Sequence, residues 1–275
     1  MQKHHHTLLR SLKQLGLITL VIHQSIFAQV NTESMRTQDL TPGAHYSLAT
    51  NLSVIEGNST IFQSKIKGRI DHVLEGGRWF FIANQKMSSK EDRLFINQGF
   101  AHLRFIRPFH PQLEGEIFLQ QEYNEFINLQ SRSLGGFGLR MSRDLFQSEI
   151  NSASALRLTL GVGLMLEHES MDAGPDGLLG DPVHGELAKL LRSSNYLVLN
   201  WEPSQKMSLQ STTYYQVDTQ RLADYRVLSQ SQLKLDLSKR FALIFELNIR
   251  RDSEPPANIE GLDLEFTQGI KYQFK

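Results

Sequence analysis

A strict alternation of apolar and polar residues constrains the fold of this chain more than any other feature. It is clearest in ALRLTLGVGLMLE, residues 155–167. Leucine or valine occupies every second position from Leu156 to Leu166, whereas Arg157 and Glu167 belong to the opposite phase. Successive side chains of a β-strand point to opposite faces of the sheet, so a period of two predicts a strand with one apolar and one polar face.

The same alternation recurs from Tyr46 to the end of the chain. It predicts twelve strands, centred near residues 50, 67, 83, 100, 117, 136, 161, 197, 212, 232, 245 and 268. The strands near 83, 100 and 197 alternate poorly, so their facing is left open. All eight prolines fall between the predicted strands, as expected for a residue that cannot donate to a hydrogen-bond ladder. A helical period is a candidate only in residues 185–192.

The start of the chain has the pattern of a secretory signal. Lys3, Arg10 and Lys13 precede an apolar run over residues 15–27, and no acidic residue occurs before Glu33. The run is shorter than the roughly 20 apolar residues of a spanning helix. We therefore predict a signal peptide at 1–28, a periplasmic N-terminal tether at 29–44, and a barrel at 45–275.

Composition excludes several classes of site. The 29 basic and 29 acidic residues balance, so charge gives no support for nucleic-acid binding. The absence of cysteine excludes disulfides and thiolate zinc sites. The acidic stretch 172–186 lacks the spacing of a known calcium loop and is predicted to be an ordinary external loop. We expect no metal and no cofactor.

The alternation by itself does not say which face is buried. A soluble barrel turns its apolar face inward, and a membrane barrel turns it toward lipid. The even strand count, the short connections on one side and longer ones on the other, and the aromatic residues near strand ends favour the membrane. The chain is therefore predicted to be all-β, a single antiparallel up-and-down transmembrane β-barrel of about twelve strands in contact with outer-membrane lipid. A secreted soluble β-barrel that acts as a binding module is the alternative.

The end of the chain, TQGIKYQFK, resembles the C-terminal signal of outer-membrane barrels. Gly269, Tyr272 and Phe274 hold the matching positions, although Lys275 follows where many barrels end on the aromatic residue. The resemblance implies a location in the outer membrane of a Gram-negative bacterium after signal-peptide cleavage. It also implies the barrel assembly machinery as a partner.

A longer resemblance covers residues 100–140. This block is similar to a Gram-negative outer-membrane family of unknown function, whose members are often labelled salt-induced outer membrane proteins. The residues that carry the similarity are His102, Arg104, Glu116, Gln120, Arg132 and the stretch GGFGLR at 135–140. The resemblance implies a barrel, and it brings no established activity and no catalytic residues.

Charged residues of both signs share the polar phase of neighbouring strands. The proline-containing turn after the fourth strand is expected to set Arg104 opposite Glu116, and the next hairpin to set Glu116 opposite Arg140. Glu122 and Arg132 are then diagonal neighbours. Cβ atoms opposite each other on one face are about 4.5–5.5 Å apart. We predict a lumen network of these five residues that neutralises a narrow polar interior.

The predicted function is a narrow channel or a structural envelope protein, and not an enzyme. Twelve strands lie between the filled interior of eight-stranded barrels and the open channel of sixteen. An outer-membrane lipid hydrolase is the rival class, because some twelve-stranded barrels carry a serine–histidine pair on the outer wall. No histidine here sits beside serine in that pattern. The substrate and the oligomeric state are not determined by the sequence.

Overall fold

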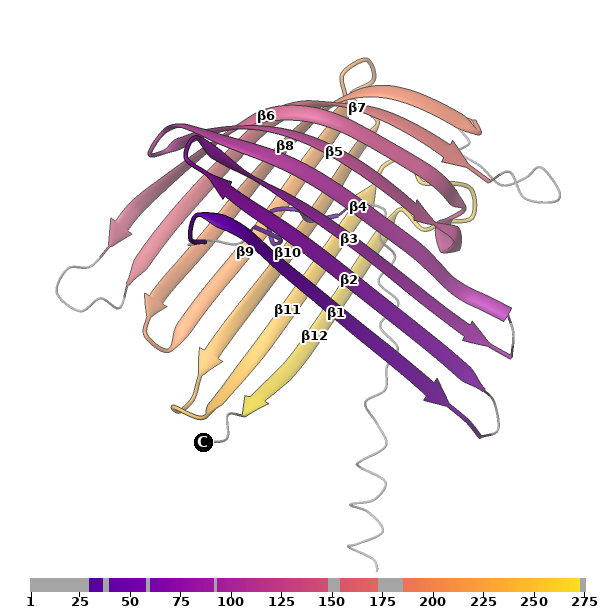
Figure 1. Cartoon of the computed structure of the whole chain (residues 1–275), viewed down its shortest axis with the longest axis horizontal. Helices are drawn as coiled ribbons and strands as arrows, with labels where there is room; N and C mark the ends of the chain where they lie inside the picture. Colours follow the sequence, from indigo (N-terminus) through magenta and orange to yellow (C-terminus); the bar gives the residue numbers. More distant parts are fainter. Residues whose placement is uncertain are drawn as a thin grey trace, which may run out of the picture.

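A computed structural model describes residues 30–36, 40–57, 60–91, 93–147, 154–172 and 185–272. Twelve strands form one sheet in which each strand pairs antiparallel with the next, from β1 to β12 (Figure 1). Each predicted strand centre falls within one of these strands. The all-β, up-and-down fold and the number of strands are therefore confirmed.

The strands are long, and the connections between them range from two-residue turns to the long loop at 172–186. The first six are β1 Gly43–Ile55, β2 Ile61–Leu74, β3 Gly77–Lys90, β4 Arg93–His110, β5 Leu113–Asn124 and β6 Leu129–Gln147, with a short 3₁₀ turn η1 at Glu125–Ile127. The others are β7 Ala155–Met171, β8 Leu187–Ser204, β9 Met207–Asp218, β10 Tyr225–Asp236, β11 Phe241–Asp252 and β12 Leu262–Tyr272.

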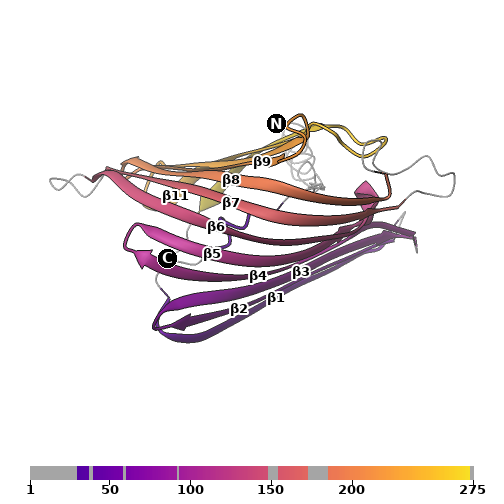
Figure 2. The ribbon, with the colours of Figure 1, turned by 90° about the horizontal axis from the view of Figure 1, so that it is seen from above.

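The sheet curls around a central space, which we call the lumen (Figures 1 and 2). Turns at 75–76, 111–112 and 205–206 define its short-turn end, and connections such as 172–186 and 253–261 define its long-loop end. Among the described residues, β1 pairs only with β2 and β12 only with β11. No helix in the described ranges is long and apolar enough to cross a membrane.

Apolar side chains cover the outside of the sheet and charged ones lie inside it. Leu119 is 60% exposed and Phe266 is 59% exposed, whereas Arg192 and Glu122 are buried. Leu160, in the strand with the clearest alternation, is also exposed rather than packed at the centre. The facing follows the predicted phase, with the apolar side outward.

The poorly alternating strands are explained by apolar residues on the inward face. Phe80 and Ile82 of β3 and Ile106 of β4 are buried in one cluster within the lumen. Tyr196 and Val198 of β8 belong to a second buried cluster. Because apolar residues occur on both faces of these strands, the sequence contrast between faces is lost.

Two local predictions are corrected. Residues 185–192 form no helix but lead into β8, in which Leu187 and Leu191 are exposed with the spacing of a strand. Pro108 and Pro203 lie inside β4 and β8 rather than between strands, and each lies where the pairing register shifts. An interrupted ladder does not require the missing N–H, so proline is tolerated there.

Candidate functional site

Residues 30–36 fill part of the lumen, and we call them the plug. Asn31, Thr32 and Glu33 are almost fully buried. The segment turns back on itself, because the backbone N–H of Ser34 donates to the side-chain oxygen of Asn31 at 3.0 Å and the N–H of Arg36 donates to the Glu33 carbonyl at 3.1 Å. An asparagine side chain commonly nucleates such a turn. The expected free tether is thus packed inside the sheet over these residues, while the periplasmic placement of 29–44 and the signal peptide at 1–28 stay predictions.

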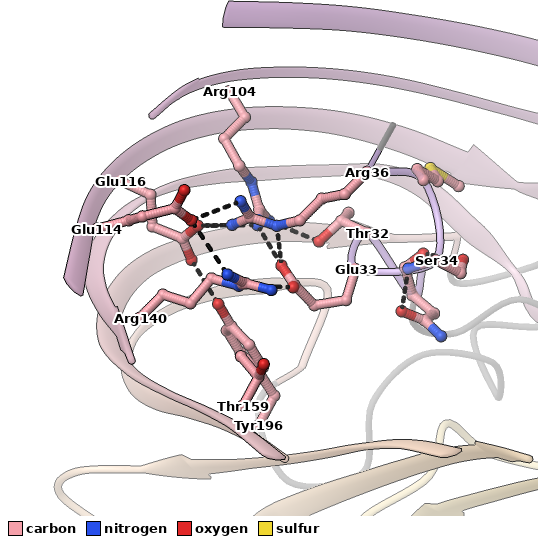
Figure 3. Close-up of polar contacts among 12 residues, drawn as sticks. Thr32, Glu33, Ser34, Arg36, Arg104, Glu114, Glu116, Arg140, Thr159 and Tyr196 are labelled. Atoms are coloured by element: carbon pink, nitrogen blue, oxygen red, sulfur yellow. Dashed lines mark hydrogen bonds and ion pairs between the residues drawn. The ribbon is translucent and has the colours of Figure 1, made fainter. Parts of the chain in front are cut away.

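Glu33 binds three guanidinium groups (Figure 3). Its carboxylate accepts from Arg36 at 2.6 Å, from Arg104 at 2.9 Å and from Arg140 at 3.2 Å. Burial alone would raise the pKa of Glu33, but the three positive charges outweigh burial and hold the pKa below its ordinary value. Glu33 is therefore an anion held by one arginine of the plug and two of the wall.

Arg36 makes the reciprocal contacts. Its guanidinium pairs with Glu116 and, at 3.4 Å, with Glu114, both on β5. Burial lowers the pKa of Arg36, but the negative charges of Glu33 and Glu116 raise this pKa by more, so the net shift is upward. The plug thus inserts one acid and one base, and each meets the opposite charge on the wall.

Hydrogen bonds to neutral groups fix the plug on other strands. The hydroxyl of Tyr214 on β9 accepts from the Glu33 backbone N–H at 3.0 Å and lies 3.2 Å from the Thr32 hydroxyl. Arg104 donates to the same Thr32 hydroxyl at 2.5 Å. The side-chain amide of Asn31 donates to Gln230 on β10 at 2.7 Å.

Apolar contacts and one further arginine complete the seat of the plug. Val30 and Met35 pack against the buried cluster on β3 and β4. The carbonyl of Met35 accepts from Arg69 of β2. The plug thus contacts strands on different sides of the lumen, which an extended tether would not do.

The predicted network residues come together, but their register is wrong by two residues at both hairpins. Phe118, not Glu116, lies opposite Arg104, because β4 continues through a bulge at Pro108 and turns at 111–112. Arg104 still reaches Glu116 diagonally at 3.2 Å. Arg140 lies opposite Glu114 and pairs with it at 3.2 Å. Glu33 and Arg36 then join the two hairpins.

Glu122 and Arg132 belong to a second network near the long-loop end. They lie directly opposite each other, not diagonally, with an ion pair of 2.7 Å. Further buried pairs join this network across β7, β8, β10 and β11: Arg132–Glu169 2.6 Å, Arg192–Glu167 2.9 Å, Arg192–Asp224 2.8 Å, Arg226–Glu167 2.7 Å and Arg226–Asp252 2.9 Å.

The sequence pattern did not predict the plug or most of the second network. The plug is polar and lacks a period, so only its burial reveals it. Arg192 was read as part of a helical candidate, and Asp224 lies in a loop. The polar phase of β7 does place Glu167 on the inward side, and the same phase on β10 would place Arg226 there, but neither phase shows that the two residues come into contact.

The space between the two networks is small. A cavity of about 40 Å³ lies there, lined by His102, Gln120, Glu122 and Tyr196 among others. A single water occupies roughly 30 Å³ in the liquid. Above the second network, Ile259 of the β11–β12 loop packs on Ile127 and Met171. The lumen between the two networks is therefore filled.

The remaining predicted sites are placed only in part. Gly269 of β12 lies opposite Ile244 of β11, and Tyr272 of β12 is half-exposed and lies opposite Phe241 of β11. Phe274 and most of the 172–186 stretch lie outside the described residues, so the assembly signal stays a prediction. Within the described ranges, no group of three or more His, Asp or Glu side chains is arranged to hold a metal ion.

A comparison with family models matches residues 51–274 to the family described as "Protein of unknown function, DUF481". The chain belongs to this family. The match contains the block 100–140 and both wall sections of the charged networks, but not the plug. DUF481 membership thus agrees with the family resemblance seen in the sequence and assigns no activity to the lumen.

Solved structures similar to this DUF481 chain are outer-membrane barrels at 9% identity. The NanC porin covers 82% of this chain and 100% of its own, with a TM-score of 0.38. The KdgM porin covers 84% and 99%, with a TM-score of 0.34. The translocator domain of autotransporter NalP from Neisseria meningitidis covers 98% and 96%, with a TM-score of 0.41. No curated protein matches the sequence at a significant level.

Proposed function

We propose that this DUF481 protein is a narrow channel of the Gram-negative outer membrane whose passage is restricted by its own N-terminal plug. The exposed apolar outer face supports a lipid environment, because large exposed apolar surfaces mark sites of contact with a membrane or a partner. The polar lumen supports contact with water and hydrophilic solutes.

The observation that carries the proposal is the position of the plug. Together with the two networks it fills the middle of the lumen beside β3–β8, and it leaves polar space along β9–β11, where a pocket of about 260 Å³ lies beside Asn31 and Ser34. A wider space of about 480 Å³ opens at the short-turn end, next to Arg36 and Arg140. A small solute entering from that end meets the plug first.

Recording in planar bilayers tests the proposal. The mature protein is expected to give small unitary steps in KCl, and a variant without residues 30–36 larger ones. Silence from both proteins, when each is shown to be inserted and folded, would favour the structural envelope protein instead. Fractionation gives an independent test of location, because recovery in the soluble fraction without detergent would favour the secreted binding module.

The geometry gives a lipid hydrolase no support. His102 lies inside the lumen and stacks on Phe118, with ring centroids 5.8 Å apart. Its ring nitrogens contact Gln120 at 3.1 Å and Arg104 at 3.2 Å, not a serine. Lipid release by the refolded protein would contradict the non-enzymatic assignment.

A further inference from the structure

The lumen has a second half whose side chains differ in kind from the charged networks. Mostly uncharged polar residues form two rows that run straight across β9–β12, because each residue lies opposite the next in the antiparallel register. The first row is Thr212, Gln230, Asn248 and Glu265, and the second is Asn200 of β8 followed by Gln210, Gln232, Glu246 and Thr267.

Open space lies in front of these rows. The pocket of about 260 Å³ is bounded by the wall of β9–β11 on one side and by Asn31 and Ser34 of the plug on the other. A space of this volume has room for several waters or for one solute the size of a single sugar ring. The cavity between the two charged networks, by contrast, measures about 40 Å³.

The lining has the hydrogen-bonding capacity that hydroxyl groups require. A side-chain amide carries two donors and a carbonyl acceptor. Only part of this capacity is used within the protein. Gln230 accepts from Asn31 at 2.7 Å, and Gln232 donates to Glu246 at 2.7 Å. The amides therefore keep donors and acceptors for a ligand.

The charges of the rows restrict the class of ligand. Glu246 is the one ionisable residue in the lining of the pocket, and its carboxylate accepts a hydrogen bond from Gln232. Carboxylates accept from hydroxyl groups but repel anions. An anionic solute is thus disfavoured in the pocket, whereas a neutral solute with many hydroxyl groups satisfies both the amides and the Glu246 carboxylate.

We propose that the part of the two polar rows on β9–β11 forms a binding site for a neutral polyhydroxylated solute the size of a monosaccharide, held between these strands and the plug. The proposal rests on the proposed channel function and names the class of solute that the channel takes. Simple solvation of a polar wall is the competing explanation, and it predicts no difference between sugars of equal size.

Swelling of proteoliposomes in glucose and in glucuronate, which share a ring and differ in charge, tests the site. Glucose is expected to enter faster than glucuronate, with a rate that saturates as its concentration rises. The double variant Gln230→Leu/Gln232→Leu should weaken half-saturation by glucose about fivefold for each hydrogen bond lost. Gln205→Leu, the same change in the exposed turn before β9, is the matched control and should leave it unchanged.

A second variant separates charge from hydrogen bonding. Glu246→Gln keeps the shape of the side chain and removes its charge, so it should raise the rate of glucuronate entry relative to that of glucose. Equal entry of the two sugars, or glucose entry that stays linear and ignores both row variants, overturns the site while KCl currents persist. If neither sugar enters and KCl gives no current, the proposed channel itself fails.

Discussion

Glu33→Gln is the change that most directly tests how the plug is held. The substitution keeps the size of the side chain and removes the charge that faces Arg36, Arg104 and Arg140. Its side chain is 3% exposed, so water does not replace the lost partner. Breaking a buried ion pair from one side costs about 3–5 kcal/mol. At about 1.4 kcal/mol for each factor of ten, the undocked plug becomes roughly 100-fold to 4,000-fold more populated.

Thiol labelling measures this population, because the chain has no cysteine of its own. Val30→Cys places a single thiol in the plug, against the buried cluster on β3 and β4. When docking is fast relative to labelling, the maleimide reaction rate follows the fraction of open plug. The rate should rise by the same factor in the Glu33→Gln background. Glu56→Gln, at an exposed carboxylate of the β1–β2 loop, is the control. Equally slow labelling in the Glu33→Gln protein would refute the ionic seat of the plug.

Three further predictions concern pH, the second network and the closure of the sheet. The folded pKa of Glu33 lies below the ordinary glutamate pKa of about 4.3, so its stabilising effect is complete above the ordinary pKa and is lost as pH falls through the folded pKa. Bilayer conductance should therefore rise only at acidic pH. A conductance that does not depend on pH would contradict this. Arg192→Leu should lower barrel stability by about 3–5 kcal/mol by leaving Glu167 and Asp224 without their shared cation, read as the midpoint of denaturant unfolding, whereas an unchanged midpoint would remove the network from the stability account. Unpaired strand edges are not stable in a bilayer, so β1 and β12 should pair with each other in the membrane. A cysteine at Ala49 of β1 should then form a disulfide with a cysteine at Thr267, or at the next inward position of β12, in the membrane-inserted protein only. If no such pair forms a disulfide there, closure between these edges is excluded.

The fold was determined largely by the sequence, because alternation is a local property. In a strand with one apolar and one polar face, such as β7, the period of two can be recognised within a dozen residues. Where that contrast fails, the sequence is less informative. The inward Phe80 and Ile82 made β3 ambiguous, since apolar residues then occupied both faces.

The network was predicted in composition but not in register. The sequence identified Arg104 and Glu116 as inward neighbours, and they do pair. Their diagonal arrangement depends on the continuation of β4 through the bulge at Pro108 to the turn at 111–112, which moves the register two residues from the predicted one. The geometry of turns and bulges sets the strand register, and an alternation of apolar and polar residues does not show where a bulge occurs.

The plug was decided by tertiary structure alone. Nothing local in residues 30–36 indicates burial, because the segment is short, polar and without a period. Its place exists only when Arg104 and Arg140 on the wall meet Glu33, and when Glu116 meets Arg36. The sequence therefore set which face of each strand meets the lumen, whereas contacts between residues more than 70 positions apart set what fills it.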